Sequence, residues 1–465
     1  MVEPPDLTSL DSAAKDALIL ALIERINVLI AEVETLKAEN AVLRKRVADL
    51  EAELGRPPKT PDNSSMPPSQ GHKPSARGGC KPKSRAHAGT HRPLHPNPTH
   101  RRDVVAERCP HCRADVSGAA QQPMHAYDRI EIPEIKPEVT RVTLYGGRCG
   151  CCARRFKAEP PAGLEPGSPF GPNLRAFVLY LRFTQAISFE RLARLTSDLL
   201  GLEISEGALV NMLDDSRPAF AQQMSLIRAK LLAGTVLQSD ETSVRVGKQT
   251  WWTWVFHDAD SACFLIRPSR GKAVVEEFLA DHRPAFWVSD RLAAQMGWAT
   301  QDHQVCLAHL IREAQYAIEA GDDAFAPALR GLLARACAIG QRRPHLADAT
   351  LRAYAAKLDR RLGALLRIVP RGRQGAKLQR VIKKVRRHLF VFVTRRALPA
   401  TNNGSEQALR PCVIFRKVTN GFRSPWAAEL YGNIRSVLET ARRRAIAPLD
   451  AIRLTLQGDP LPDTG

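Results

Sequence analysis

Residues 235–246 read TVLQSDETSVRV, a run rich in β-branched residues that predicts a long strand. The aromatic run TWWTWVFH follows at 250–257, and the short apolar run ACFLI follows at 262–266. Residues 272–281 then have a helix-like pattern, and the apolar run AFWVS at 285–289 predicts a fourth strand. Three strands, a helix and a fourth strand is the element order of an RNase-H-like α/β core.

Two acidic residues fall at corresponding places in this pattern. Asp240 lies within the first predicted strand, and Asp290 directly follows the fourth. A third carboxylate is available in Glu406, one turn into a helix expected after the polar residues 401–405, with Arg410 four residues further on the same face. Hard Mg²⁺ prefers carboxylate oxygens, so the three acids are candidate catalytic residues and candidate ligands of two Mg²⁺ ions. Arg410 would contact a substrate phosphate or hold the carboxylate.

The charge of the chain indicates a polyanionic partner. The formal net charge is +20 over 465 residues, and clustered Lys and Arg gain affinity by displacing counterions from phosphates. This charge does not distinguish DNA from RNA, and a basic protein without such a partner is the plain alternative. One cluster lies in the predicted helix 377–387, for which a solvated surface helix is the alternative to a phosphate-binding face. Its candidate DNA contacts are Lys377, Arg380, Lys383, Lys384 and Arg387.

Residues 12–54 carry unbroken heptads that predict a coiled-coil helix. Ile or Val occupies most a positions, Leu occupies the d positions from Leu22 to Leu50, and Asn40 stands at one a position. This choice of residues favours a two-stranded parallel coil, and the Asn pair fixes its register. We therefore expect a homodimer joined by a leucine zipper. The alternative is an amphipathic helix packed on its own domain.

Residues 56–103 are predicted to be a disordered basic linker. The stretch 56–102 holds ten prolines and ten Lys or Arg against one acidic residue, which leaves little apolar surface to bury. Such a linker could lie along DNA phosphates or act as a solvated tether, and the composition favours neither.

Two C-x-x-C pairs predict a structural zinc ribbon over residues 104–160. The four expected Zn²⁺ ligands are Cys109, Cys112, Cys149 and Cys152. Between the pairs, 129–135 and 139–144 have strand-like composition. Cys151 or His111 could replace one ligand, and a redox-active pair is a further alternative.

Residues 165–232 predict a helical module. Three short helices are expected at 174–183, 189–199 and 205–214, with Ser205 as the N-cap of the third. Short helices joined by a turn are typical of a helix–turn–helix DNA-binding unit, although any small three-helix unit would give a similar pattern.

Four sequence blocks carry a family resemblance. They are SDET at 239–242, CLAHLIR at 306–312, NNGSEQALRP at 402–411 and RKV at 416–418. They resemble the signature blocks of the insertion sequence sixty-six family of transposases, and the similarity extends over nearly the whole chain. Four positions depart from the usual pattern: Arg291 and Leu292 follow the second acid where Gly and an aromatic are common, Leu307 replaces a common Trp, and Gln407 replaces a common Arg.

The resemblance implies a DDE-type DNA transposase, a polynucleotidyl transferase that cuts and joins DNA with Asp240, Asp290 and Glu406. It implies a catalytic domain at 233–445 with a mostly helical insertion at about 315–395, followed by a C-terminal tail at 446–465. It also implies that DNA, as transposon ends and target, is the partner, and that helper proteins of the same element take part. The remaining residues singled out are Arg416 and Lys417 as DNA contacts, and Cys306, His309 and Asn403 as supporting residues.

The chain is thus predicted to be a multidomain α+β protein. Its parts are an N-terminal coiled-coil helix, a zinc ribbon with one structural Zn²⁺, a helical DNA-binding module and an RNase-H-like α/β catalytic core with an α-helical insertion. The sequence shows no signal peptide or membrane span, which predicts a cytoplasmic, nucleoid-associated protein. Two alternatives remain: a catalytically inactive DNA-binding regulator of transposon ends, and a host nuclease with an RNase-H-like fold.

Overall fold

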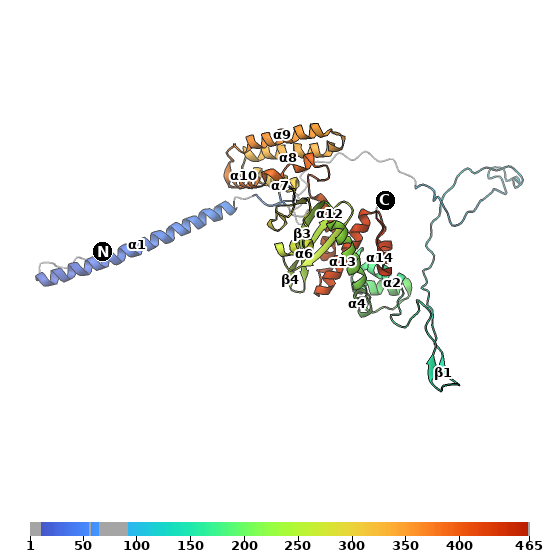
Figure 1. Ribbon diagram of the computed structural model, residues 1–465. Coiled ribbons are helices and arrows are strands. Elements are labelled where there is room, and N and C mark those ends of the chain that lie inside the picture. Colours follow the sequence, from blue (N-terminus) through green and yellow to red (C-terminus); the bar gives the residue numbers. More distant parts are fainter. Residues whose placement is uncertain (1–10, 55–56, 65–91, 464–465) are drawn as a thin grey trace. The chain divides into compact units, whose positions relative to one another are not determined.

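The computed structural model describes residues 11–54, 57–64 and 92–463 (Figure 1). The chain divides into two compact units, each described separately below. The first unit comprises residues 1–72 and 306–396, and the second comprises 73–305 and 397–465. None of the helices in the described part of the chain combines the length and the apolar character needed to cross a bilayer.

The second unit is built on a five-stranded mixed sheet. Its strands are β3 (Val236–Val246), β4 (Gln249–His257), β5 (Ala262–Arg267), β6 (Phe286–Ser289) and β7 (Asp302–Val305). The strand order is β5-β4-β3-β6-β7. β4 pairs antiparallel with both β3 and β5, whereas β6 pairs parallel with both β3 and β7. The first four strands confirm the sequence prediction. β7 was not predicted, because its buried residues include the polar pair His303 and Gln304 and give no apolar run.

Helix α6 (Lys272–Leu279) connects β5 to β6 and packs on the aromatic side chains of the sheet. The rings of Phe256 and Phe278 stack with their centroids 4.0 Å apart, and Trp287 meets Phe256 edge-on. All three side chains are fully buried, so replacing Phe278 by Ala would cost about 3–5 kcal/mol of stability. This packing fixes the position of β6, which leads into Asp290.

Helices α12 (Asn403–Thr419) and α13 (Pro425–Arg443) return to the sheet after the insertion, and α13 lies against the edge strand β5. The hydroxyl oxygens of Ser436 and Thr440 accept hydrogen bonds from the backbone N–H groups of Phe264 (2.8 Å) and Ala262 (3.0 Å). A Cβ on Gly432 would lie 2.9 Å from the carbonyl oxygen of Phe264, so the helix approaches the strand closely at a residue without a side chain. The free edge of the sheet is thereby covered.

In the described part of the second unit, four helices precede the sheet, and they lie within the range of the predicted helical module. They are α2 (Pro172–Phe183), α3 (Phe189–Leu200), α4 (Glu206–Asp215) and α5 (Arg217–Leu232). The side chain of Ser205 caps α4 as expected, accepting a hydrogen bond from the N–H of Ala208 (3.2 Å). Gly201 ends α3 in the left-handed conformation, with φ of 62°.

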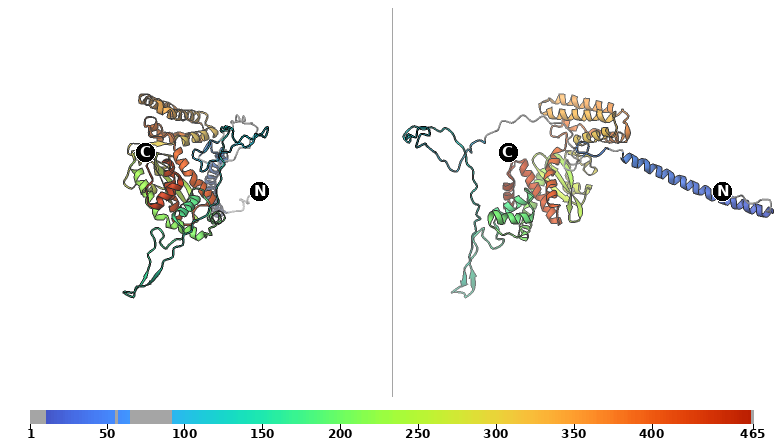
Figure 2. Two further views of the ribbon diagram at one scale, coloured as in Figure 1. Left: turned by 90° about the vertical axis from the view of Figure 1, so that its right-hand side faces the viewer. Right: turned by 180° about the vertical axis from the view of Figure 1, so that it is seen from behind.

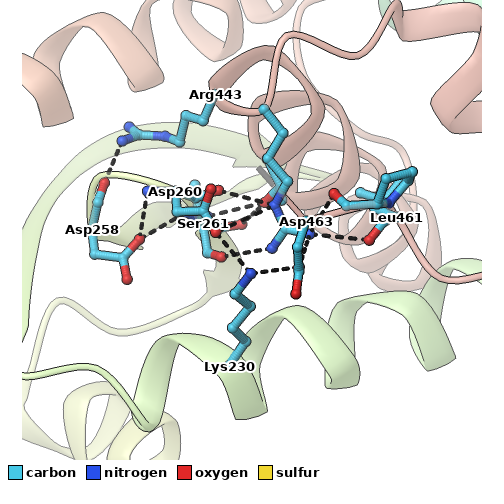
Figure 3. A network of polar contacts seen from close by, with 11 residues as sticks. Lys230, Asp258, Asp260, Ser261, Arg443, Leu461 and Asp463 are labelled. Carbon is cyan, nitrogen blue, oxygen red and sulfur yellow. Dashed lines mark hydrogen bonds and ion pairs between the residues drawn. The ribbon is translucent and has the colours of Figure 1, made fainter. Parts of the chain in front are cut away.

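The C-terminal residues are part of the second unit and not a loose tail. Helix α14 (Pro448–Gln457) buries Ala451 and Ile452 and contacts α2, α13 and α5. The chain beyond it is fastened by Arg444, whose guanidinium donates to Ser261 Oγ (3.0 Å) and to the carboxylate of Asp463 (3.1 Å) (Figure 3). Lys230 completes this network with ion pairs to Asp260 and Asp463.

The residues between the two C-x-x-C pairs differ from the prediction. The structure has no strand at 129–135 or 139–144, so those two predictions are wrong. Short antiparallel strands instead flank the second pair, as β1 (Gly146–Arg148) and β2 (Arg155–Lys157). Ile130 and Ile132 are exposed by 57% and 76%, so the segment has β-forming residues but no neighbouring strand or core to pack against.

The first unit contains the long helix α1 (Ser12–Leu54) and a small helical bundle. The bundle helices lie side by side (Figure 1, Figure 2) and are α7 (Leu307–Glu319), α8 (Phe325–Arg342), α9 (Asp348–Leu365), α10 (Gly372–Val385) and α11 (Val391–Thr394). These helices cover the range of the predicted helical insertion, and α7 begins before residue 315. The bounds of α1 match the predicted coiled-coil helix.

Part of the predicted linker has definite structure. Residues 57–64 form a turn in which Asn63, only 2% exposed, accepts a hydrogen bond from the N–H of Thr60 (2.7 Å) and donates one to the carboxylate of Glu319. This turn therefore docks on the end of α7, and the prediction of disorder over 56–103 is wrong for it. The buried side-chain amide of Asn63 holds this turn in place, and the amino-acid composition of the segment gives no sign of that contact. Residues 65–91 of the linker lie outside the described residues.

Candidate active site

The parallel pairing of β3 and β6 brings the first two predicted acids to one level of the sheet. Gln238 is paired with Val288, and each acid follows its strand partner by two residues. Asp240 and Asp290 therefore lie next to each other, at the carboxyl end of β6. Both side chains are half-buried.

A third carboxylate joins them that the sequence analysis did not single out. Asp240, Glu241 and Asp290 each offer a carboxylate oxygen, and these atoms all lie within 4.8 Å of one another. No other group of three potential ligands gathers so closely within residues 11–54, 57–64 and 92–463. Such a set of hard oxygen donors fits a divalent cation such as Mg²⁺.

The electrostatics of this cluster disfavour three negative charges. Burial raises the pKa of Asp240 well above its usual value, and the neighbouring carboxylates of Glu241, Asp290 and Glu406 raise it further. Burial and Asp290 also raise the pKa of Glu241. The acids thus repel one another in the absence of a cation, which is the electrostatic condition that a metal site requires.

Glu241 is held by a buried polar network. Arg270 donates to one of its carboxylate oxygens through Nε (2.8 Å) and Nη2 (2.5 Å), and Gln295 Nε2 donates to the other (2.5 Å). Gln295 in turn accepts from Ser239 Oγ (2.8 Å), which accepts from the indole N–H of Trp287 (2.7 Å). Glu241, Arg270 and Gln295 are functional candidates that sequence reasoning missed. The only signal was the Asp-Glu dipeptide, and alternation along a strand argues against both side chains meeting.

Glu406 lies in the first turn of α12, as predicted, and its side chain is exposed. Its carboxylate is close enough to raise the pKa of Asp240 but is not among the three that lie within 4.8 Å. Asn403, predicted as a supporting residue, is exposed. The contact that ties this turn to the sheet is made by Asn402, which is fully buried and donates through Nδ2 to the carbonyl of Ser239 (2.7 Å).

The predicted DNA contacts on α12 differ in their surroundings. Arg410 and Lys417 are exposed. Arg416 is half-buried, and its guanidinium donates to Thr242 Oγ1 (3.1 Å) and to the carbonyl of Ser243. Arg416 therefore ties α12 to β3, while contact of these residues with DNA stays a prediction.

The basic residues of α10 line an open groove. The groove encloses about 440 Å³ and is formed by Arg373, Gln374, Lys377, Arg380, Val381 and Lys384. Lys383 and Arg387 are also exposed, so the five cations predicted here as DNA contacts all face solvent. The opposite face of α10 is apolar, with Leu378 and Ile382 buried in the helical bundle. The groove is thus a cationic surface on a firmly packed helix.

The two C-x-x-C pairs adopt the same turn. In each, the N–H of the first cysteine donates to the carbonyl five residues later, and its carbonyl accepts the N–H four residues later, all at 2.9 Å. The residue four positions after Cys109 or Cys149, Arg113 or Ala153, has a positive φ of 61° or 55°. Within the described residues, the two turns do not gather their four thiols into one cluster.

Backbone N–H groups point at the first thiol of each turn. Those of Cys112 and His111 lower the pKa of Cys109, and those of Cys152 and Cys151 lower the pKa of Cys149. Hydrogen bonds of this kind favour the thiolate, the form in which cysteine binds a metal.

Cys306 and His309 lie at the start of α7. Cys306 is fully buried at the N-cap position, and His309 is half-buried. They do not belong to a group of three potential metal ligands among the described residues. Their supporting role stays a prediction.

Comparison with known families covers the core of the chain. Residues 167–430 match the family described as Transposase IS66 family. The match spans more than half of the chain, from five residues before α2 to a point within α13, and it begins after the C-x-x-C turns. No curated protein matches the chain.

Proposed function

This chain belongs to the IS66 family of transposases, and on that premise we propose that it is a DDE-type enzyme that cuts and joins DNA at Asp240, Asp290 and Glu406. The observation that carries the proposal is the convergence of Asp240 and Asp290, which are distant in sequence, at one end of neighbouring parallel strands. The strand order β5-β4-β3-β6-β7 supports an RNase-H-like core, in which acids at these positions serve phosphodiester chemistry.

The donor set fits Mg²⁺, and two ions held there would stabilise the attacking and leaving oxygens of a phosphodiester. Asp240 and Asp290 would supply oxygen ligands from the sheet, and Glu406 would supply one from α12. None of the three acts as a covalent nucleophile. Cleavage by water breaks a phosphodiester bond and leaves a 3′-hydroxyl and a 5′-phosphate. In strand transfer that 3′-hydroxyl would attack a target phosphate, forming a new phosphodiester bond while the target bond breaks and releases the target's own 3′-hydroxyl.

Glu241 serves a different purpose in this proposal. Arg270 and Gln295 occupy both of its oxygens, so it lines the acidic cluster while remaining fastened to the protein. We assign it to orienting the cluster, with Asp240 and Asp290 left to face the cations and the scissile phosphate.

DNA would be held by surfaces outside the acidic cluster. The α10 groove carries cations on one face of a well-packed helix, which suits a phosphate backbone. The α2–α4 module is the candidate reader of transposon ends, because short capped helices joined by a turn are typical of a helix–turn–helix unit. Action on DNA places the protein at the bacterial nucleoid, together with helper proteins of the same element.

The α1 helix would join two copies. Its heptad residues are exposed in the single chain, with Ile26 at 53% and Leu29 at 43%, so an apolar seam runs along a helix without a covering partner in the described chain. A second copy would bury that seam, with Asn40 facing its equivalent. Two linked copies would hold two transposon ends together.

A structural Zn²⁺ would be bound by Cys109, Cys112, Cys149 and Cys152. The proposal is supported by the identical turns of the two pairs and by the N–H groups directed at their first thiols. The thiol of Cys152 makes a hydrogen bond to the thiol of Cys149, as the thiol of Cys112 does to that of Cys109. This favours Cys152 over Cys151 as the ligand.

The decisive experiment measures cleavage and strand transfer of an end-containing duplex in Mg²⁺. Asp240→Asn should abolish both reactions while leaving DNA binding unchanged. Undiminished joining by this variant would refute the assignment of the acids. A wild-type protein that binds ends but never nicks them would instead support a catalytically inactive regulator.

A further inference from the structure

The first turn of α12 is tied to the sheet by a chain of buried polar side chains. Asn402 Nδ2 donates to the carbonyl of Ser239, the residue before Asp240, at 2.7 Å. The hydroxyl of Ser405 lies 2.7 Å from Asn402 Oδ1 and 2.8 Å from His257 Nε2. All four side chains are 0–1% exposed, so these bonds are shielded from water and specific in geometry.

Asn402 has an unusual role for a residue at the start of a helix. An N-cap Asn normally uses its side chain to accept a hydrogen bond from the first turn of its own helix. Here the side chain accepts no bond from a backbone N–H of that turn: Oδ1 accepts from the hydroxyl of Ser405, and Nδ2 reaches across to strand β3. The first turn of α12 therefore has no side-chain cap on its backbone N–H groups. It is fixed instead to β3, the strand that carries Asp240.

His257 forms the other end of the chain of contacts. Its Nδ1 lies 3.0 Å from the carbonyl oxygen of Asp258, and its Nε2 lies 2.8 Å from the hydroxyl oxygen of Ser405, which donates its proton to Asn402 Oδ1. Arg443 of α13 also donates to that carbonyl, as Figure 3 shows. The imidazole is therefore held between the turn after β4 and the first turn of α12.

Gly404 allows this close approach. A Cβ at this position would lie 3.2 Å from Cε1 and 3.6 Å from Nε2 of His257, which is tighter than ordinary contact. The residues Asn402, Gly404 and Ser405 thus have one joint consequence: the backbone of the first turn rests directly on the sheet. Glu406 is the next residue, and it projects from the turn that these contacts hold.

We propose that Asn402, Ser405 and His257 are positioning residues that fix Glu406 relative to Asp240. This inference rests on the proposed function of the two acids. The three residues touch neither substrate nor cation; they set where the third carboxylate stands with respect to the first. Asn402 binds the residue before Asp240, and Ser405 is the residue before Glu406, so the contact chain joins the two acids through their immediate neighbours.

The test compares Asn402→Ala with Asn403→Ala, which changes the exposed neighbour in the same turn. Mn²⁺ is titrated into full-length protein and its binding followed by calorimetry, without DNA. Asn402→Ala should raise the Kd for Mn²⁺ about 10–100-fold, as expected when the support of a metal ligand is removed. Asn403→Ala should leave the Kd unchanged, and an equal Kd for wild type and Asn402→Ala would overturn the proposal.

A double-mutant cycle separates positioning of Glu406 from general damage to the sheet. In a Glu406→Gln background, adding Asn402→Ala should weaken Mn²⁺ binding no further, because the residue that the contacts position is already changed. A further loss of similar size would show that Asn402 acts elsewhere. If Asn402→Ala does not fold, Ser405→Ala takes its place, since it removes one oxygen and leaves the bond from Asn402 to Ser239.

Hydrogen exchange distinguishes failure of this inference from failure of the proposed function. The amides of residues 405–408 should exchange faster in Asn402→Ala than in Asn403→Ala, whether or not a cation binds. Absence of Mn²⁺ binding to wild type would count against the metal site alone. Unchanged exchange in Asn402→Ala would count against the positioning contacts alone.

Discussion

Arg270 neutralises Glu241 at the side of the acidic cluster: its Nε and Nη2 lie 2.8 and 2.5 Å from one carboxylate oxygen. The guanidinium also lies over the ring of Trp252, with its central carbon 4.7 Å from the ring centroid. One of the three converging carboxylates therefore has a fixed countercharge within the protein. The remaining charge is concentrated on Asp240 and Asp290, where a cation would be needed.

Removing Arg270 should destabilise the second unit. Arg270→Met leaves the buried carboxylate of Glu241 without its cation, and an unsatisfied buried charged group costs about 1–3 kcal/mol or more. Urea unfolding of the variant measures the loss. Arg267→Met is the matched control, because its partner Glu277 is partly exposed and such pairs contribute about 0–1 kcal/mol. Equal losses for the two variants would contradict the structural role assigned to Arg270.

The α10 groove should dominate sequence-independent DNA affinity. Changing Lys377, Arg380 and Lys384 to Ala removes three exposed cations from one helix face, which should weaken DNA binding and reduce the slope of log K against log salt by about 3. Binding is measured by fluorescence anisotropy over a range of salt concentrations. The control changes Arg352, Lys357 and Arg360, three exposed cations on α9. A similar slope change in that control would mean that net charge, and not the groove, determines affinity.

Oligomer state should depend on the d positions of α1. Leu29→Lys with Leu36→Lys places cations in the proposed seam and should give monomers by light scattering, because buried charges facing one another cannot be solvated. Ala31→Lys with Ala38→Lys adds the same charges at the same spacing on the outer f positions and should leave the dimer intact. Dimers that persist in the first variant would point to an interface elsewhere.

Zinc content should follow the four predicted cysteines. Cys152→Ser should lower bound Zn²⁺, measured by elemental analysis of purified protein, from one ion per chain towards none. Cys151→Ser is the control, because the thiol of Cys152 makes a hydrogen bond to the thiol of Cys149 and the thiol of Cys151 does not. Loss of zinc in the Cys151 variant alone would reassign the ligand.

His257 should make the second unit sensitive to acid. Burial, together with Arg443 and Arg442, lowers the pKa of His257 from 6.5 to about 3. Between pH 6.5 and 3 the imidazole of His257 is protonated in the unfolded chain but not in the folded chain. The free energy of unfolding therefore falls as the pH falls towards 3, by about 2 kcal/mol at pH 5.

His257→Gln should remove this contribution, and urea unfolding of wild type and variant at neutral and acidic pH measures it. His282→Gln, at a half-buried histidine of the same unit, should keep the pH dependence of wild type. An unaltered pH dependence in His257→Gln would show that the imidazole is protonated in the folded protein.

The amino-acid sequence by itself determined the local features of this protein. β-Branched and aromatic runs predicted four strands, Ser205 marked the start of a helix, and the heptads gave the bounds of α1. Asp240 and Asp290 could be selected because one lies within a strand, and the other directly after a strand, that the sequence pattern predicts. These features depend on interactions between residues near one another in the chain, and such interactions leave a periodic pattern.

Only the tertiary structure decided which side chains meet. Glu241 joins the acidic cluster and is fastened by Arg270 and Gln295, although neither partner is near it in sequence. Asn402, and not Asn403, faces the sheet, because one helical residue turns a side chain by about 100° and the first helical residue cannot be placed that accurately from sequence. Contacts of this kind arise from the packing of whole elements against one another, so they have no signature in any single stretch of the chain.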